Sequence, residues 1–267
     1  MALIQLVVIA LVQGITEFLP ISSSAHLVLV PVVTGWPDQG ILVDVAVHIG
    51  TLGAVVAYFR ADVAAMLRGG LSFFGLRASP AERRLALALI IGTIPVVIAG
   101  LALELLDALE AMRSAAVIGW TSLIFGLVLY GADQHGALVK KMADMTLGRA
   151  LLIGLAQVLA LVPGTSRSGI TMTAARALGF TRPEAARFSM VLSIPTIFAA
   201  GTLGIYEIAK RGDLRLQADA LLAGGLAFVS ALVAIALLMR WLQHASMTPF
   251  VVYRVVLGLG LLAWAYL

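Results

Sequence analysis

Long apolar stretches, separated by short polar segments, run through nearly the whole chain. A helix needs about 20 mostly apolar residues to cross a bilayer, and six stretches are suited to this. They lie at residues 40–59, 85–106, 115–132, 186–208, 218–240 and 248–267. The pattern therefore predicts an all-α polytopic membrane protein, with one integral-membrane domain over residues 1–267.

Two further apolar stretches, at about 2–19 and 150–162, end differently from the other six. Each is followed by a proline, a cluster of serines or threonines, and then a second apolar stretch. Backbone that is broken at membrane depth is tolerated only where it is buried in protein or lines a wet cavity. We therefore expect two re-entrant helix–loop–helix hairpins, at 1–38 and 150–182, beside six full transmembrane helices.

The two halves of the chain share this organisation. Residues 1–132 and residues 150–267 each contain one polar hairpin followed by three crossings. An odd number of crossings turns the second repeat upside down, so that the hairpins enter from opposite faces and meet near the midplane. Inverted repeats with broken helices are typical of many transporters, which keeps a transport function open.

The composition agrees with a membrane location. Of the 267 residues, 61% are hydrophobic and 12% are charged, and the mean hydropathy is +1.03. An ordinary soluble domain has about 25% charged residues. The composition therefore excludes a cytosolic enzyme, a nucleic-acid-binding domain, a disordered protein and a secreted disulfide scaffold. The lack of cysteine also excludes thiolate catalysis and cysteine-based zinc sites.

The charged residues lie mostly in loops and indicate an orientation. Basic residues predominate in the segments 60–84, 133–149 and 240–247, whereas 104–113 is acidic and 207–219 is mixed. Cytoplasmic loops favour Lys and Arg, so we expect the three basic segments inside and both termini outside. These loops also explain the net charge of +4 without a nucleic-acid partner.

The first polar cluster combines a carboxylate, hydroxyls and an imidazole. Gln13 and Glu17 are one helical turn apart and share a helix face, and their oxygens suit a divalent cation. If a helix begins at the serines that follow Pro20, Ser23 and His26 come within reach as a nucleophile and a base. Otherwise the serines are helix caps and His26 packs as a polar residue.

The second polar cluster, residues 163–171, reads Pro-Gly-Thr-Ser-Arg-Ser-Gly-Ile-Thr. Its glycines permit close backbone approach, and hydroxyl and amide groups at a helix start favour an anion. Arg167 adds a planar fork that matches phosphate oxygens, or else forms a salt bridge to Glu17. The candidate phosphate-binding residues are Ser22, Gly164, Ser166, Arg167, Ser168 and Thr171.

Two other intramembrane groups are harder to assign. His48 follows Asp44 by one helical turn in the 40–59 span, and we interpret the two as a packing pair or a contact at a cleft rim. Arg254 lies within the last span, where an arginine needs a partner.

Both polar clusters resemble those of a known family. The segment from Gln13 to His26 is similar to the (E/Q)xxxE region of the undecaprenyl-diphosphate phosphatases, also called bacitracin-resistance proteins. Residues 163–171 match the PGxSRSxxT motif of that family at every fixed position. The resemblance covers essentially the full chain, including the order of the spans and the separation of the motifs.

This resemblance implies a multi-pass enzyme of the bacterial inner membrane whose site opens toward the periplasm. It would hydrolyse undecaprenyl diphosphate to the monophosphate, recycling the lipid carrier for peptidoglycan synthesis and conferring bacitracin resistance. The resemblance also implies Mg²⁺ or Ca²⁺, with Glu17 as the essential carboxylate and Gln13 as its partner. Gln13 stands where many relatives have Glu, which leaves one carboxylate fewer. Whether the protein forms a homodimer is left open.

Three mechanisms are consistent with these residues, beside the alternative of a polyprenyl-phosphate transporter or flippase without hydrolysis. In the first, Arg167 holds the diphosphate while Ser23 attacks the terminal phosphorus and His26 takes its proton. In the second, His26 is itself the nucleophile. In the third, a water activated by the metal or by Glu17 attacks directly. A nucleophile beside the phosphate cluster favours hydrolysis over transport.

Overall fold

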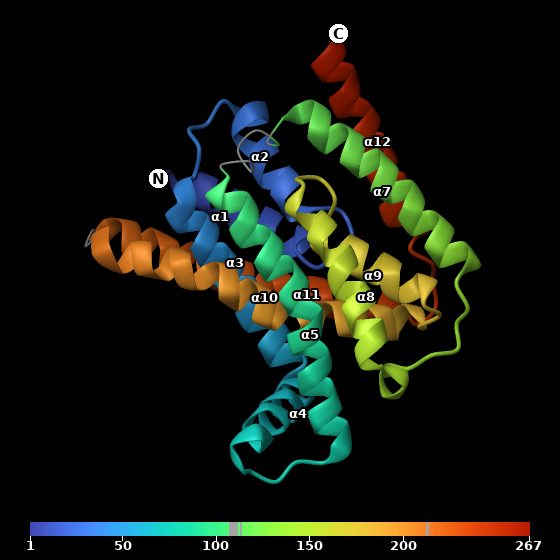
Figure 1. Cartoon of the computed structure of the whole chain (residues 1–267). Helices are drawn as coiled ribbons and strands as arrows, with labels where there is room; N and C mark the ends of the chain where they lie inside the picture. The colour runs from blue at the N-terminus through green and yellow to red at the C-terminus, as the bar shows by residue number, and fades with distance from the viewer. Residues whose placement is uncertain (107–111, 113, 212–213) are drawn as a thin grey trace.

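The computed structural model describes residues 1–106, 112, 114–211 and 214–267. Helices make up most of this part of the chain, and no β-strand occurs in it (Figure 1). The predicted all-α class is therefore confirmed. The α-helices are, in chain order, α1 (Leu3–Thr16), α2 (Ser23–Thr34), α3 (Gly40–Tyr58), α4 (Arg60–Leu71), α5 (Pro80–Leu105), α7 (Ala115–His135), α8 (Leu147–Val158), α9 (Arg167–Ala177), α10 (Arg182–Arg211), α11 (Leu214–Trp241) and α12 (Thr248–Tyr266). Short 3₁₀ helices are η1 (Ser72–Phe74), η2 (Met142–Asp144) and η3 (Leu159–Leu161).

Each of the six predicted spans falls on one of these helices. Within the described ranges, four helices are long and apolar enough to cross a membrane: α5, α7, α12 and the part of α11 from Ala218 to Trp241. A fifth candidate is the pair α3 and α4, which is bent by 91° at Phe59. These helices are consistent with multi-pass membrane insertion. The full count of six crossings and two re-entrant hairpins stays a prediction.

The helix breaks occur where the polar clusters predict them. The helix α1 ends at Thr16 and α2 begins at Ser23, while η3 ends at Leu161 and α9 begins at Arg167. Both breaks contain proline, which cannot donate a backbone hydrogen bond. The backbone then turns through positive φ angles, at Ser22 in the first break and at Gly164 and Ser166 in the second. Two short helices joined by a turn thus replace one continuous helix at each cluster.

The first helix of each hairpin packs against a long helix from the other half of the chain, α1 on α11 and α8 on α5. Both contacts depend on small residues, which let helix backbones approach closely. A Cβ atom on Gly14 would lie 1.8 Å from Ser230 Oγ, and one on Gly154 would lie 2.4 Å from the Gly92 carbonyl oxygen. The division into repeats at 1–132 and 150–267 stays a prediction. The packing of α1 on α11 and of α8 on α5 relates the two halves in the same way and is consistent with it.

A buried ionic cluster joins the end of α7 to the neighbouring helices. Asp133 Oδ1 accepts hydrogen bonds from Nε of Arg176 at 3.1 Å and of Arg182 at 2.7 Å, and Asp133 Oδ2 accepts from the Met247 amide at 3.0 Å. Arg176 is fully buried and also donates to four backbone carbonyls around the α7 and α9 ends. This cluster fixes the second hairpin against α7 and the start of α12.

The orientation in the membrane stays a prediction. Parts of two loops whose charges bear on it also lie outside the described residues. These parts are 107–111 and 113 in the acidic segment 104–113, and 212–213 in the mixed segment 207–219.

We predict that Asp133→Asn destabilises the protein by about 3–5 kcal/mol, because it leaves the buried Arg176 guanidinium without its carboxylate. Thermal melting of the detergent-solubilised protein would measure this as a clearly lower Tm. The control is Glu82→Gln, whose partner Arg68 has 57% of its side chain exposed, and we expect that variant to melt close to wild type. An unchanged Tm for Asp133→Asn would contradict the structural role of the cluster.

Candidate active site

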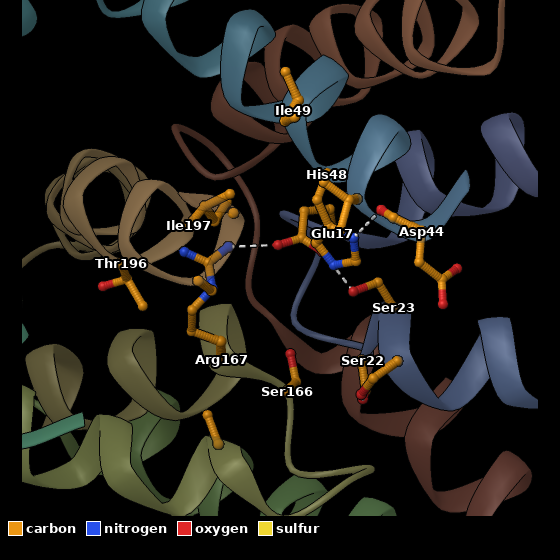
Figure 2. Close-up of a pocket in the computed structure, with 15 residues that line it drawn as sticks. Glu17, Ser22, Ser23, Asp44, His48, Ile49, Ser166, Arg167, Thr196 and Ile197 are labelled. Atoms are coloured by element: carbon orange, nitrogen blue, oxygen red, sulfur yellow. Dashed lines mark hydrogen bonds and ion pairs between the residues drawn. The ribbon is translucent and has the colours of Figure 1, made fainter. Parts of the chain in front are cut away.

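A cavity of about 400 Å³ lies where the two helix breaks meet α3 and α10 (Figure 2). Its walls come from four segments that are far apart in the sequence. The lining residues are Glu17, Ser22, Ser23, Ser24, Asp44, Val45, His48, Ile49, Ala160, Ser166, Arg167, Thr196, Ile197, Ala200 and Gly201. The fold therefore brings the two polar clusters predicted from the sequence into one site.

Glu17 is the centre of the polar contacts in this cavity. Its Oε1 accepts a hydrogen bond from Arg167 Nη2 at 2.7 Å, and this salt bridge is one of the two roles predicted for Arg167. Its Oε2 accepts from Ser23 Oγ at 2.5 Å and from Gln13 Nε2 at 2.9 Å. The Glu17 side chain is only 6% exposed, so these donors replace the water that an ionised carboxylate would otherwise need. The Arg167 guanidinium carbon also lies 5.9 Å from the centre of the Phe18 ring.

The two turns that present these side chains have similar backbone geometry. Ser22 has φ 74° and Ser166 has φ 71°, and in the described part of the chain they are the only non-glycine residues with positive φ. Such conformations cost about 1–3 kcal/mol and persist where the surroundings enforce them, often at functional sites. Each serine immediately precedes a helix, so the next residue, Ser23 or Arg167, is the first of that helix.

The other predicted phosphate-binding residues form the support of the second turn. Ser168 Oγ donates to the Leu19 carbonyl at 2.9 Å, which joins the two hairpins. Thr171 Oγ1 donates to the Arg167 carbonyl at 2.8 Å, and it lies 2.6 Å from Ser189 Oγ. Gly164 packs so closely on α7 that a Cβ atom would lie 2.1 Å from Thr121 Oγ1. Ser22 and Ser166 line the cavity, whereas these three residues position the loop behind it.

His26 does not make the expected contact with Ser23. Its Nδ1 lies 2.6 Å from the Ser22 carbonyl oxygen, and its Nε2 lies 2.5 Å from the hydroxyl of Tyr253. Both ring nitrogens are therefore occupied, and the hydroxyl of Ser23 is bonded to Glu17 instead. The spacing of three residues places His26 on the same helix as Ser23, but the turn at Ser22 directs the two side chains to different partners.

His48 is a cavity residue, which agrees with the contact at a cleft rim that was one of its two interpretations from the sequence. Its Nε2 lies 3.8 Å from Glu17 Oε2, and its Nδ1 lies 2.7 Å from the Asp44 carbonyl oxygen (Figure 2). A carbonyl only accepts hydrogen bonds, so Nδ1 carries a proton. Nε2, which carries no proton in the neutral ring, is the nitrogen that faces the Glu17 carboxylate. The signal available in the sequence was an ionisable pair inside an apolar span, which is a functional-site hypothesis by default.

Arg254 finds its partners in the backbone of the helix breaks. The guanidinium is fully buried and donates to the Pro20 carbonyl at 3.4 Å and to the Gly164 carbonyl at 3.0 Å. It also donates to the carbonyls of Thr121 and Ser122 on α7. One side chain on α12 thus holds both breaks in place.

The donor set fits a divalent cation that is shared with a phosphate ligand. The carboxylate-bearing residues lining the cavity are Glu17 and Asp44. Gln13 is buried behind Glu17, and its Oε1 has no hydrogen-bond partner in the described part of the structure. No group of three or more His, Asp or Glu side chains suited to a metal occurs among the described residues. Mg²⁺ commonly uses one or two carboxylates together with substrate phosphates. The cavity offers the two carboxylates, and the substrate would bring the phosphates.

The chain is similar to known proteins over its whole length. Residues 6–260 match the family described as bacitracin resistance protein BacA. The "Undecaprenyl-diphosphatase" of Roseobacter denitrificans is 54% identical over 266 residues, which cover all of both chains. A protein with the same name from Ruegeria pomeroyi is 53% identical over the same coverage. The "Undecaprenyl-diphosphatase 1" of Rhodospirillum rubrum is 49% identical, over all of this chain and 96% of the relative. This chain belongs to the bacitracin resistance protein BacA family.

Proposed function

We propose that this protein hydrolyses the terminal phosphate of undecaprenyl diphosphate, yielding undecaprenyl phosphate and inorganic phosphate. One observation carries the proposal: the Glu17 carboxylate accepts hydrogen bonds from the Ser23 hydroxyl and from the Arg167 guanidinium in one cavity. Ser23 and Arg167 come from polar clusters that are far apart in the sequence. Relatives that match the whole chain are named for this activity. A transporter without hydrolysis is not favoured, because transport requires no nucleophile beside the phosphate site.

Arg167 and Ser166 bind the terminal phosphate in this proposal. Both line the cavity at the start of α9, where the free N–H groups of a helix N-terminus favour an anion. On binding, the Arg167 guanidinium exchanges part of its contact with Glu17 for phosphate oxygens. It then stabilises the charge that spreads over the transferred phosphoryl group.

Ser23 is the nucleophile favoured by the geometry. Its hydroxyl already donates to Glu17 Oε2 at 2.5 Å, so the carboxylate can accept the proton as Oγ attacks. The Oγ–P bond forms, the bond from that phosphorus to the bridging oxygen breaks, and undecaprenyl phosphate leaves with the bridging oxygen. Water then attacks the phosphoserine, the Oγ–P bond breaks, and Oγ regains a proton through Glu17. A phosphohistidine on His26 and direct attack by water are the alternatives.

Mg²⁺ or Ca²⁺ is the proposed cofactor, and the carboxylates of Glu17 and Asp44 would hold it together with phosphate oxygens. When bound, the cation would neutralise negative charge on the diphosphate. Gln13 holds the Glu17 carboxylate from behind, so we assign it a positioning role toward the metal site.

The proposed location is the bacterial inner membrane, with the cavity open to the periplasm. The basic segments 60–84, 133–149 and 240–247 support this orientation. There the enzyme would return the lipid carrier to peptidoglycan synthesis. Because bacitracin binds the same diphosphate, an abundant enzyme would confer resistance. A homodimer stays a prediction.

Phosphate release by the purified, detergent-solubilised protein tests the function. With undecaprenyl diphosphate and Mg²⁺, we expect wild type to release phosphate and Arg167→Gln to lose at least about 10³-fold in kcat/KM, because a phosphoryl-contacting arginine contributes that much. Arg77→Gln, in the loop before α5, is the control and should retain activity. If wild type releases no phosphate although it binds the lipid, the hydrolase proposal is wrong and transport is favoured.

Trapping the intermediate tests the nucleophile. Rapid acid quenching with substrate labelled at the terminal phosphate should give an acid-stable phosphoenzyme in wild type and none in Ser23→Ala, whose kcat falls by at least about 10³-fold. Ser72→Ala is the control and should give the same phosphoenzyme as wild type. An acid-labile phosphoenzyme would instead assign the attack to His26, and the absence of a phosphoenzyme under single-turnover conditions would assign it to water.

The position of His48 beside the Glu17 carboxylate predicts that kcat/KM falls with the loss of polarity at residue 48. His48→Leu removes the polar edge of the ring, which lies 3.8 Å from Glu17 Oε2, from the cavity, and we expect kcat/KM to fall about tenfold, equivalent to an electrostatic contact of about 1.4 kcal/mol. His48→Gln keeps a polar side chain of similar reach and should stay within about threefold of wild type. The loop variant His244→Leu is the control. Equal activity of His48→Leu and wild type would show that His48 only packs.

A further inference from the structure

We propose that Tyr253 on α12 is a positioning residue for the reaction, which acts through the ring of His26 on the turn at Ser22 that presents the Ser23 hydroxyl to Glu17. This inference rests on the proposed function, because it assigns a role in presenting the nucleophile. Tyr253 belongs to the last helix of the chain, about 230 residues from the turn it supports.

The hydrogen bonds around His26 have one direction. Nδ1 lies 2.6 Å from the Ser22 carbonyl oxygen, which can only accept, so Nδ1 donates. In the neutral ring, Nε2 is then an acceptor, and the Tyr253 hydroxyl lies 2.5 Å from it as the donor. The two rings are also stacked, with centroids 5.6 Å apart and planes 12° from parallel. The Ser22 carbonyl therefore sets the tautomer, and Tyr253, through its hydroxyl and its stacked ring, fixes the orientation of the His26 ring that holds that carbonyl.

The turn at Ser22 lacks the side-chain cap that stabilises its counterpart, and its carbonyl also accepts the His26 amide at 3.4 Å. Ser22 and Ser166 have nearly the same φ, 74° and 71°. The Ser166 hydroxyl accepts the Gly169 amide at 3.1 Å and so caps α9. The helix α2 has no side-chain cap. The Ser22 hydroxyl lies 3.2 Å from the hydroxyl of Ser24, as that of Ser166 does from Ser168, but it accepts no backbone amide. In the first hairpin, the His26 ring supplies the side-chain contact to the turn.

Support at Ser22 bears directly on the nucleophile, which is the next residue. The Ser23 hydroxyl must stay within hydrogen-bond distance of Glu17, and a shift of about 1 Å in a reacting group can cost 10²-fold in rate. The residue after Tyr253, Arg254, donates to the Pro20 carbonyl in the same hairpin. Two adjacent residues of α12 therefore hold the first break on either side of Ile21.

The same contacts distinguish positioning from proton transfer by His26. If His26 accepted the proton of Ser23, its ring would have to leave the hydroxyl of Tyr253 or the carbonyl of Ser22. Removal of the Tyr253 hydroxyl would then free the base, and kcat would be unchanged or higher. If Tyr253 positions the turn, kcat falls, because the ring and the turn lose a fixed contact.

The experiment is phosphate release by Tyr253→Phe, which keeps the stacked ring and removes only the hydroxyl. We expect kcat to fall about tenfold while KM stays within about twofold of wild type, because phosphate binding by Arg167 is untouched. Tyr266→Phe, on the same helix and bonded to Trp120, is the control. In a His26→Phe background, Tyr253→Phe should cause no further loss, since Tyr253 acts only through His26.

A second measurement does not require catalysis. Diethylpyrocarbonate should modify His26 faster in Tyr253→Phe than in wild type, as followed by mass spectrometry of the peptide, because Nε2 loses its partner. An unchanged or higher kcat in Tyr253→Phe, a further loss in the His26→Phe background, or an equal modification rate would each overturn the proposal. If wild type releases no phosphate but the modification rates differ as expected, the contact is upheld and the proposed hydrolysis fails instead.

Discussion

Backbone groups freed at a helix break must find partners inside the protein, and the rest of this structure depends on that constraint. A carbonyl that is buried away from water without a hydrogen-bond partner costs several kcal/mol. Arg254 meets the constraint at both breaks, through the carbonyls of Pro20 and Gly164. Arg176 does the same for the ends of α7 and α9. Arg254 on α12 thus completes hydrogen bonds of both broken helices that form the site, together with Ser168 and Thr121, which donate to the carbonyls of Leu19 and Pro163.

The site itself depends on a single carboxylate with several partners. Glu17 accepts hydrogen bonds from three side chains. They are the Arg167 guanidinium that would bind phosphate, the Ser23 hydroxyl that would attack it, and the amide of Gln13. Because these contacts share one group, the position of the nucleophile is coupled to the position of Arg167. Two turns with positive φ, which most side chains avoid, present Ser23 and Arg167 from opposite hairpins. The conformational cost of these turns is offset by contacts from α7, α9 and α12.

Much of the fold and half of the site were predictable because they depend on local pattern. Apolar length predicts helices, and proline beside serines predicts the breaks, so α1, α2, α8 and α9 begin and end close to where we expected them. Glu17, His26 and Arg167, set among serines, stood out because ionisable groups are costly in apolar segments. The roles of His26 and His48 were harder to assign. Both histidines follow a polar residue at helical spacing, and sequence alone cannot tell which ring faces the cavity.

The sequence by itself determined the helical membrane architecture, the positions of the breaks and the chemical types gathered in them, since these follow from hydropathy and backbone stereochemistry within short segments. Only the tertiary structure decided which of these groups meet. It joined Glu17 to Arg167 across 150 residues, brought His48 to the cavity, and turned His26 toward Tyr253. The reason is physical: partners on different helices are selected by packing and by the need to satisfy buried polar groups, and neither depends on distance along the chain.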